Sequence, residues 1–313
     1  MNVAQRRRLW IDTDTASDDA VAMVMAFKNP GVEVVGVSVV AGNVPLEQAT
    51  QIALYTAELC GAKVPIHAGA NRALVRTFVT AQNVHGKDGM GDIGLPLNGR
   101  TPTSAAGVEA LIDAFRAAPG TMDLVTLGPL TNIALAVRAE PKFASWVRRC
   151  VMMGGTGVLP GNVTPLAEFN FWVDPEAAHI VFESGMPLEM VGWDVSVADA
   201  VISDALAAEI RALGPLGEYC VDSQRVLREF CRTETKLDGF DLPDPIAMFV
   251  AIEPDAATRE AHRRVEISLG TGHERGQTIV DHLGGTKREP NCRVVYRVDR
   301  ERFVAALKAA CRP

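Results

Sequence analysis

The sequence lacks the features that would indicate a zinc site, a nucleic-acid partner or a membrane span. Its six cysteines are scattered with no C-x-x-C pair, which favours reduced thiols and no zinc site. Basic residues form no tract beyond Arg6–Arg8 and the formal net charge is −7, so we expect no nucleic-acid partner. No apolar run approaches the roughly 20 residues that cross a bilayer, and no signal-peptide segment follows the first arginines. We therefore expect a cytoplasmic protein without membrane contact.

Internal repeats, low-complexity tracts and Pro- or Ser-rich linkers are also lacking. The 313 residues are 48% hydrophobic and 22% charged, a composition typical of folded globular proteins. We therefore expect residues 1–313 to form a single domain.

Strand patterns alternate with helical patterns along most of the chain. This alternation predicts an α/β protein with an open, mostly parallel sheet and helices on both faces. The predicted strands are 8–11, 32–40, 122–127, 149–153 and 188–191, and the predicted helices are 20–27, 45–60, 104–118, 130–139 and 175–184. The last quarter differs, because strands joined by Gly-containing turns predict extra antiparallel strands at one sheet edge. These strands are 265–269, 277–281 and 292–298, before a helix over 300–310.

The segment from Asp12 to Asp19, DTDTASDD, places four carboxylates between a predicted strand and a predicted helix. In an open α/β sheet this junction lies at the carboxyl end of the strand, where ligands bind. Crowded carboxylates repel one another unless a cation or protons intervene, and oxygen donors suit Ca²⁺ or Mg²⁺. The cluster therefore predicts a metal site.

The residues alone leave two other interpretations of this cluster open. Ser17 could cap the helix, with Asp18 and Asp19 in its first turn, but capping explains neither of the two earlier aspartates. A D-x-D phosphatase would use Asp12 as its nucleophile together with Mg²⁺. That class normally carries Thr or Val where this chain has Ala16.

Seven motifs follow one another along the chain, and the first is D-x-D-x-x-x-D-D over residues 12–19. In their order and spacing they resemble the inosine-uridine preferring nucleoside hydrolase family, and the matches cover most of the chain. Each later motif is weak alone, whereas the seven together are specific. The later motifs are Val40-Ala41-Gly42-Asn43, His85-Gly86-x-Asp88-Gly89, Gly128-Pro129-Leu130-Thr131-Asn132, Met152-Met153-Gly154-Gly155, Glu168-Phe169-Asn170 and Asp244-Pro245.

The resemblance implies a Ca²⁺-dependent enzyme that hydrolyses the N-glycosidic bond of ribonucleosides to ribose and a free base. It implies that Asp18 is the base that accepts a proton from the attacking water. The metal ligands that it implies are the carboxylates of Asp14, Asp19 and Asp244 and the main-chain carbonyl of Leu127, with that of Thr126 as the alternative.

The resemblance also implies a set of substrate contacts and an oligomer. Asn and Glu side chains would hold the sugar hydroxyls, Met153 would pack against the sugar face and His85 would contact the departing base. The substrate-binding residues implied are Asn43, His85, Met153, Asn162, Glu168 and Asn170. Members are usually dimers or tetramers, so we expect a homodimer or homotetramer.

The chain departs from the family immediately before Asp244. Many members carry His there and purine-specific members carry Trp, whereas this chain has Pro243, which has no proton to give. The base preference therefore stays open. A non-catalytic protein that binds calcium and a nucleoside is the alternative function. The candidates for contact with the base are His85, Trp172, Trp193 and, in a predicted helix over 218–235, Tyr219, Arg225, Arg228 and Cys231.

Overall fold

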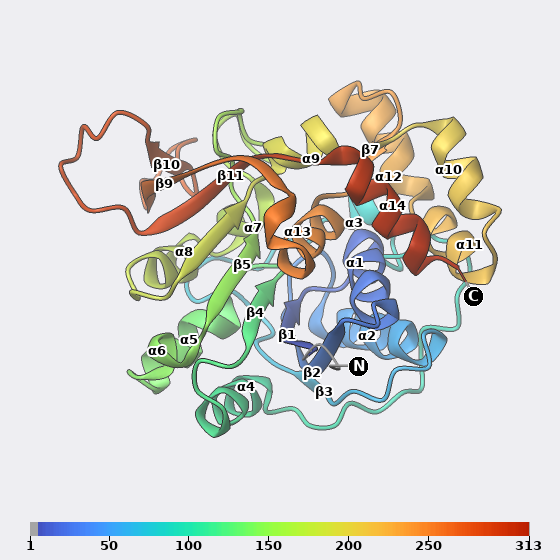
Figure 1. Cartoon of the computed structure of the whole chain (residues 1–313), viewed down its shortest axis with the longest axis horizontal. Coiled ribbons are helices and arrows are strands. Elements are labelled where there is room, and N and C mark those ends of the chain that lie inside the picture. Colours follow the sequence, from blue (N-terminus) through green and yellow to red (C-terminus); the bar gives the residue numbers. More distant parts are fainter. Residues whose placement is uncertain (1–5, 313) are drawn as a thin grey trace, which may run out of the picture.

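A sheet of nine strands forms the centre of the computed structural model, which describes residues 6–312 (Figure 1). The strand order is β10-β9-β11-β6-β5-β4-β1-β2-β3. Seven neighbouring strands, from β11 to β3 in that order, are paired in parallel, and β9 pairs antiparallel with both β11 and β10. The strands are β1 Arg7–Thr13, β2 Val32–Val39, β3 Ile66–Ala68, β4 Asp123–Thr126, β5 Arg149–Met153, β6 Leu188–Val191, β9 Ala257–Ile267, β10 Thr278–Asp281 and β11 Cys292–Val298. A separate antiparallel pair consists of β7 Val201–Ile202 and β8 Phe240–Asp241.

Helices cover both faces of the sheet, as the alternating pattern predicts. Helices α1, α2, α13 and α14 contribute to one hydrophobic core, and α4, α5, α6 and α8 contribute to the other. In the part of the chain that the structure describes, no helix has the length and apolarity needed to cross a membrane. The helices are α1 Ser17–Lys28, α2 Leu46–Leu59, α3 Gln82–His85, α4 Gly107–Ala117, α5 Thr131–Ala139, α6 Phe143–Trp146, α7 Phe169–Val173, α8 Pro175–Phe182, α9 Trp193–Asp199, α10 Asp204–Arg211, α11 Pro215–Asp222, α12 Arg225–Phe230, the π-helix Cys231–Thr235, α13 Pro243–Ile252, the 3₁₀-helix Pro254–Ala256 and α14 Arg300–Ala310.

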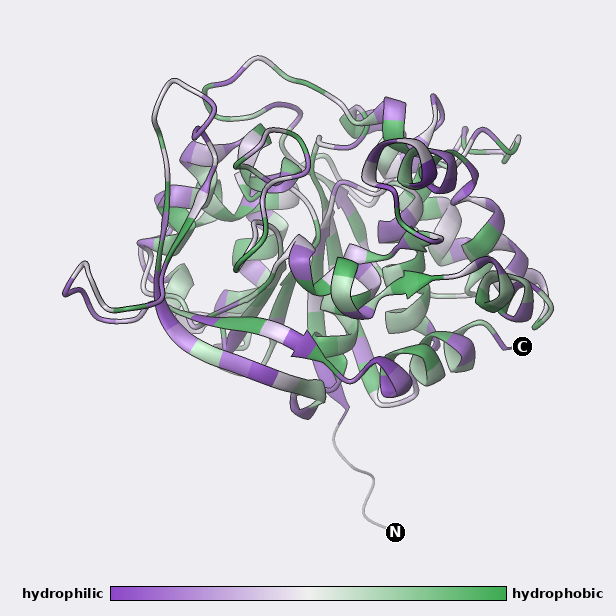
Figure 2. Ribbon diagram, turned by 90° about the horizontal axis from the view of Figure 1, so that it is seen from above, coloured by the Kyte–Doolittle hydropathy of each residue, from purple (hydrophilic) through white to green (hydrophobic). Residues whose placement is uncertain are grey.

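The two cores follow from the period-two alternation of side chains along each strand. In β1, Leu9 and Ile11 enter one core while Trp10 enters the other. Figure 2 shows hydrophobic residues along the interior strands, whereas the surrounding helices carry both hydrophobic and hydrophilic residues. Because β1 is buried from both sides, its carboxyl end lies inside the molecule.

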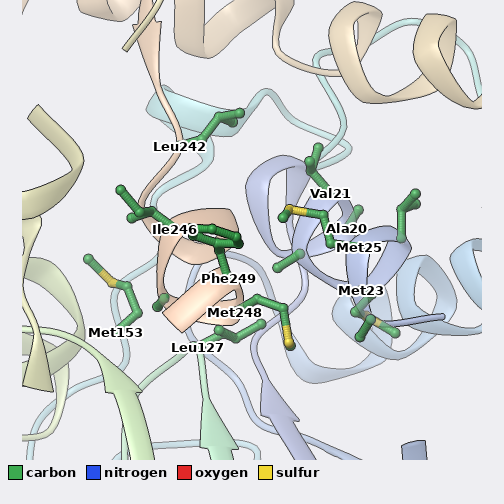
Figure 3. Packing of buried hydrophobic residues seen from close by; sticks show 14 of the residues in the cluster. Ala20, Val21, Met23, Met25, Leu127, Met153, Leu242, Ile246, Met248 and Phe249 are labelled. Carbon is green, nitrogen blue, oxygen red and sulfur yellow. The ribbon is translucent and has the colours of Figure 1, made fainter. Parts of the chain in front are cut away.

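Helix α13 is nearly all apolar and packs against α1. Figure 3 shows Phe249 and Ile246 of α13 beside Ala20 of α1. The end of β4 contributes Leu127 and the end of β5 contributes Met153 to the same core. This packing brings the N-terminal turns of two helices to the carboxyl ends of the central strands.

The predicted fold class is confirmed, with several local corrections. Helix α1 begins at Ser17, three residues before the predicted start. Of the three C-terminal strands only β9 runs against the sheet, because β11 pairs in parallel with β6. The predicted helix over 218–235 is wrong as a single element, since α11, α12 and a π-helix replace it.

Asp12, in β1, connects its strand to β2 and α5 through buried hydrogen bonds. Its Oδ2 accepts from Ser38 Oγ at 2.5 Å and from Asn132 Nδ2 at 2.8 Å. Asn132 Nδ2 also donates to the carbonyl of Val39 at 3.2 Å, and its Oδ1 accepts from the amide of Ala70 at 2.8 Å. One asparagine therefore joins the ends of β1 and β2 to the chain that follows β3.

Replacing Asn132 tests this connection. Asn132→Ala leaves buried donors and acceptors without partners, and each such group costs about 1–3 kcal/mol, so we expect a loss of about 2–4 kcal/mol in the free energy of unfolding. Denaturant unfolding measures it. The matched control is Asn98→Ala at an exposed position, where a change within about 0.5 kcal/mol is expected. Equal stability of the two variants would contradict the assigned role.

Candidate active site

The N-terminal turns of α1 and α13 place three aspartates at one point. Asp18 and Asp19 lie in the first turn of α1, and Asp244 lies in the first turn of α13. One carboxylate oxygen from each of the three lies within 4.8 Å of the other two, and all three side chains are buried. The N-terminus of a helix carries partial positive charge, which favours carboxylates at this position.

A fourth aspartate, Asp14, lies just after β1 and beside this group. Its Oδ2 accepts a hydrogen bond from the amide of Asn43 at 2.6 Å, while its Oδ1 has no hydrogen-bond partner among the described residues. The backbones of Gly42 and Gly128 lie so close that a Cβ on either would overlap the Asp14 carboxylate. The glycines in two of the sequence motifs thus make room for this side chain.

Asp19 stabilises the start of α1 as well as facing the cluster. Its Oδ2 accepts from the amide of Ala16, the N-cap residue, at 2.9 Å, and its Oδ1 accepts from Thr13 Oγ1 at 2.5 Å. The interpretation of Ser17 as the N-cap is wrong, because the Ser17 hydroxyl instead lies 2.9 Å from Nδ1 of His85. Asp19, rather than Ser17, provides the side-chain contact at the beginning of the helix.

Burial and mutual repulsion oppose ionisation of these carboxylates. Burial, followed by the charges of Asp19 and Asp18, holds the pKa of Asp14 well above its ordinary value. Asp244 has a strongly raised pKa for the same reasons. Burial raises the pKa of Asp18 to about 7, and the nearby charge of Asp241 adds to the shift. The cluster therefore needs a compensating positive charge before all its members can be anionic at neutral pH.

The donor set fits a divalent cation of the hard type. Every side-chain donor at this point is a carboxylate oxygen, and Asp18 Oδ1 and Asp14 Oδ1 are buried atoms without hydrogen-bond partners within residues 6–312. Oxygen donors of this kind suit Ca²⁺ or Mg²⁺, whereas zinc and copper sites in proteins favour nitrogen and sulfur. The aspartate cluster can therefore hold a metal ion.

Asp12 is not placed to act as the nucleophile of a D-x-D phosphatase. Its side chain is fully buried, it does not line the cavity described below, and its Oδ2 is held by Ser38 and Asn132. A nucleophile must reach the reacting atom of its substrate. The phosphatase interpretation therefore finds no support in the geometry.

A cavity of about 330 Å³ opens above the aspartate cluster, and its volume lies in the range of small-molecule sites. Asp14 and Asp19 do not line it, although both contact or face residues that do. All nine of the other sequence-predicted site residues do line it: Asp18, Asn43, His85, Leu127, Met153, Asn162, Glu168, Asn170 and Asp244.

One end of the cavity is lined by polar side chains that the backbone holds in place. Asn170 Nδ2 donates to the carbonyl of Leu127 at 2.9 Å and to that of Met153 at 3.2 Å. Glu168 is the N-cap of α7, with Oε1 accepting from the amide of Asn170 at 2.9 Å and Oε2 from that of Gly155 at 2.7 Å. Burial raises the pKa of Glu168 to about 7, against the lowering effect of these amides. These side chains are fixed before any ligand enters.

Asn43 and Asn162 lie at different depths of the cavity. Asn43 is buried, and its Nδ2 lies 3.3 Å from Oδ2 of Asp19. Asn162 is exposed, and its Oδ1 accepts from the amide of Phe169 at 3.0 Å, which places it at the rim. Asn43 therefore connects the cavity to the aspartate cluster, whereas Asn162 belongs to the loop at the entrance.

His85 is the last residue of the short helix α3, and its side chain is buried. Burial lowers the pKa of His85 to about 4, so the imidazole is neutral at pH 7. Its Nδ1 lies 2.9 Å from the hydroxyl of Ser17 and 3.5 Å from Oδ1 of Asp18. The ring therefore joins α3 to the first turn of α1 at the cavity wall.

A second wall of the cavity comes from α9, α12, the π-helix and β8. Cys231 lines it, as do both Trp172 and Trp193, whereas the other candidates from the 218–235 stretch, Tyr219, Arg225 and Arg228, are not among its lining residues. Asp241 is buried in this wall and could not be found from the sequence, because no motif includes it. The lining residues of this wall are Trp193, Leu227, Phe230, Cys231, Thr235 and Asp241.

Comparisons with known proteins identify relatives of this chain. The family model for the inosine-uridine preferring nucleoside hydrolases matches residues 9–305. The chain is 34% identical over 310 residues to the pyrimidine-specific ribonucleoside hydrolase RihB of Escherichia coli O9:H4 (strain HS), covering 98% of each chain.

Solved structures show the same similarity. A plant nucleoside hydrolase, the PpNRh1 enzyme, superposes with a TM-score of 0.92 at 30% identity, covering 97% of this chain and 98% of that one. A purine-preferring ribonucleoside hydrolase from Gardnerella vaginalis gives a TM-score of 0.90 at 29% identity, with the same coverage. The resemblance carried by the seven motifs is thereby confirmed, and the chain belongs to the inosine-uridine preferring nucleoside hydrolase family of ribonucleoside-hydrolysing enzymes.

Proposed function

We propose that this protein uses Ca²⁺ to hydrolyse the N-glycosidic bond of ribonucleosides, with Asp18 as the general base. The observation that carries the proposal is the meeting of Asp18, Asp19 and Asp244 beside a cavity of nucleoside size, which Asp18 and Asp244 line. Asp14, Asp19, Asp244 and the carbonyl of Leu127 would hold the ion. When bound, Ca²⁺ would supply a Lewis acid for a water molecule and for the ribose diol.

Asp18 is suited to accept the proton of the attacking water. It lines the cavity, whereas Asp14 and Asp19 do not, and its Oδ1 has no hydrogen-bond partner among the described side chains and backbone. The water oxygen would bond to the anomeric carbon as the bond from that carbon to the base breaks. One proton of the water would go to Asp18, which would return it to solvent, and the base would leave with the bonding electron pair and take up one proton from solvent.

The polar end of the cavity supports binding of the sugar. Asn43, Glu168 and Asn170 are buried polar residues around the cluster, and Met153 adds an apolar surface. The bond to the base breaks through an oxocarbenium-like state that carries positive charge on the sugar, and the surrounding carboxylates would stabilise that charge. Asn162 would contact the sugar from the rim.

Separate substitutions of two aspartates test which one is the general base and which one is a metal ligand. Asp18→Ala is expected to reduce kcat by about 10²–10⁴ because the proton acceptor is lost, while Ca²⁺ affinity changes little. Asp14→Ala is expected to weaken Ca²⁺ binding first. Calorimetric titration with Ca²⁺ and an assay of released ribose measure the two effects. Loss of Ca²⁺ binding in Asp18→Ala would mean that Asp18 is a ligand, as its place in the three-carboxylate group allows.

Removal of the metal gives a second test. Dialysis against a chelator is expected to abolish ribose release and to lower the melting temperature, because the buried carboxylates then repel one another. Added Ca²⁺ is expected to restore both, with a melting temperature that rises with the Ca²⁺ concentration. Ribose release that persists in metal-free protein would contradict the proposal.

Nucleosides that lack the 2′-hydroxyl test whether the polar end of the cavity binds ribose. Buried polar groups left unpaired disfavour a substrate that lacks their partner, so we expect 2′-deoxyribonucleosides to have kcat/KM lower by about 10²-fold or more. A panel of purine and pyrimidine nucleosides with and without the 2′-hydroxyl measures this. Tight binding of ribonucleosides with no ribose release would instead favour the non-catalytic alternative.

A further inference from the structure

The second wall of the cavity depends on one buried carboxylate. Asp241 Oδ2 accepts hydrogen bonds from Trp193 Nε1 at 3.0 Å and from Ser196 Oγ at 2.8 Å. Its Oδ1 lies 3.5 Å from Sγ of Cys231, a weaker donor. Asp241 thereby connects β8 to α9 and to the first residue of the π-helix.

These contacts fix the two surfaces that the wall presents to the cavity. The indole of Trp193 has a single polar atom, so its hydrogen bond to Asp241 sets the orientation of the ring. Cys231 is almost completely buried and begins a π-helix, a rare element that is frequently found at functional sites. Both residues line the cavity, and Asp241 holds them to each other.

The position of this wall identifies what it would contact. This step rests on the proposed function, in which the ribose fills the polar end beside Asp18 and Asp244. The nucleobase would then lie against the remaining lining residues, among which are Trp193, Phe230 and Cys231. Pro243, beside the cluster, offers no proton to the base. Discrimination between bases would then depend in part on the shape of the second wall.

We infer that Asp241 is a positioning residue for nucleobase selection, acting through the orientation of Trp193 and of the π-helix at Cys231. Its side-chain hydrogen bonds go to residues of the second wall, and it acts on the sugar end only through its charge near Asp18. Substitutions at Asp241 therefore change KM and the ranking of nucleosides more than they change binding of ribose.

The test compares Asp241→Ala, Asp241→Asn and Trp193→Phe in the full-length protein. For Asp241→Ala we expect KM for the preferred nucleoside to rise about tenfold and the purine-to-pyrimidine ratio of kcat/KM to change by about fivefold or more. The inhibition constant of ribose is expected to stay within about twofold, because the side chain of Asp241 makes no hydrogen bond to the residues of the polar end. Asparagine keeps an acceptor for Trp193 and Ser196, so Asp241→Asn is expected to recover most of the loss.

Trp193→Phe keeps an aromatic ring without the donor, and it is expected to shift the ranking in the same direction as Asp241→Ala. It also keeps the test decisive if Asp241→Ala fails to fold, which a thermal melt reveals. An unchanged ranking in the folded variants would overturn the inference. Equal weakening of ribose and nucleosides, or an Asp241→Asn variant as impaired as Asp241→Ala, would also overturn it.

Calorimetric titration with free uracil, cytosine, adenine and hypoxanthine separates this inference from the proposed function, because it needs no turnover. If the wild-type protein releases no ribose, the proposed catalysis fails, and weaker binding of bases to Asp241→Ala would still support the positioning role. A wild-type protein that binds none of these bases, or binds them as the Asp241→Ala protein does, would overturn it.

Discussion

Repulsion among buried carboxylates is the constraint on which the site depends. Asp14, Asp18, Asp19 and Asp244 meet where the end of β1 and two helix N-termini converge, and burial raises the pKa of each. Helix dipoles and amide donors reduce the electrostatic cost but leave two buried oxygens without partners in the described chain. A divalent cation would resolve this conflict, and the same charges would favour a sugar that becomes positive as its bond to the base breaks.

The two ends of the cavity are built from different parts of the fold. The floor comes from the carboxyl ends of central strands and from the starts of α1 and α13, which pack against each other in one hydrophobic core. The second wall comes from α9, α12, a π-helix and the small β7–β8 pair, outside the main sheet. The reaction would thus depend on the central sheet and the helices packed on it, and the choice of base on elements outside that sheet.

Much of the floor could be predicted from the sequence, because its residues lie in local motifs at strand ends. Asp18 and Asn43 are examples, each following a valine-rich or apolar strand. The second wall could not, since Asp241 acts through Trp193 and Cys231, and no local spacing connects these three residues. The division of residues 218–235 into α11, α12 and a π-helix could not be predicted either, because these residues favour a helix and tertiary packing overrides that propensity.

Asp19 has two tasks, since it caps the first turn of α1 and also faces the aspartate cluster. Any replacement therefore alters the beginning of a buried helix together with the chemistry beside it. A substitution at Asp18 would disturb the helix less, because Oδ1 of Asp18 accepts no hydrogen bond from the described residues. A descendant that had lost catalysis but kept the fold would therefore be expected to retain Asp19 after Asp18 had been replaced.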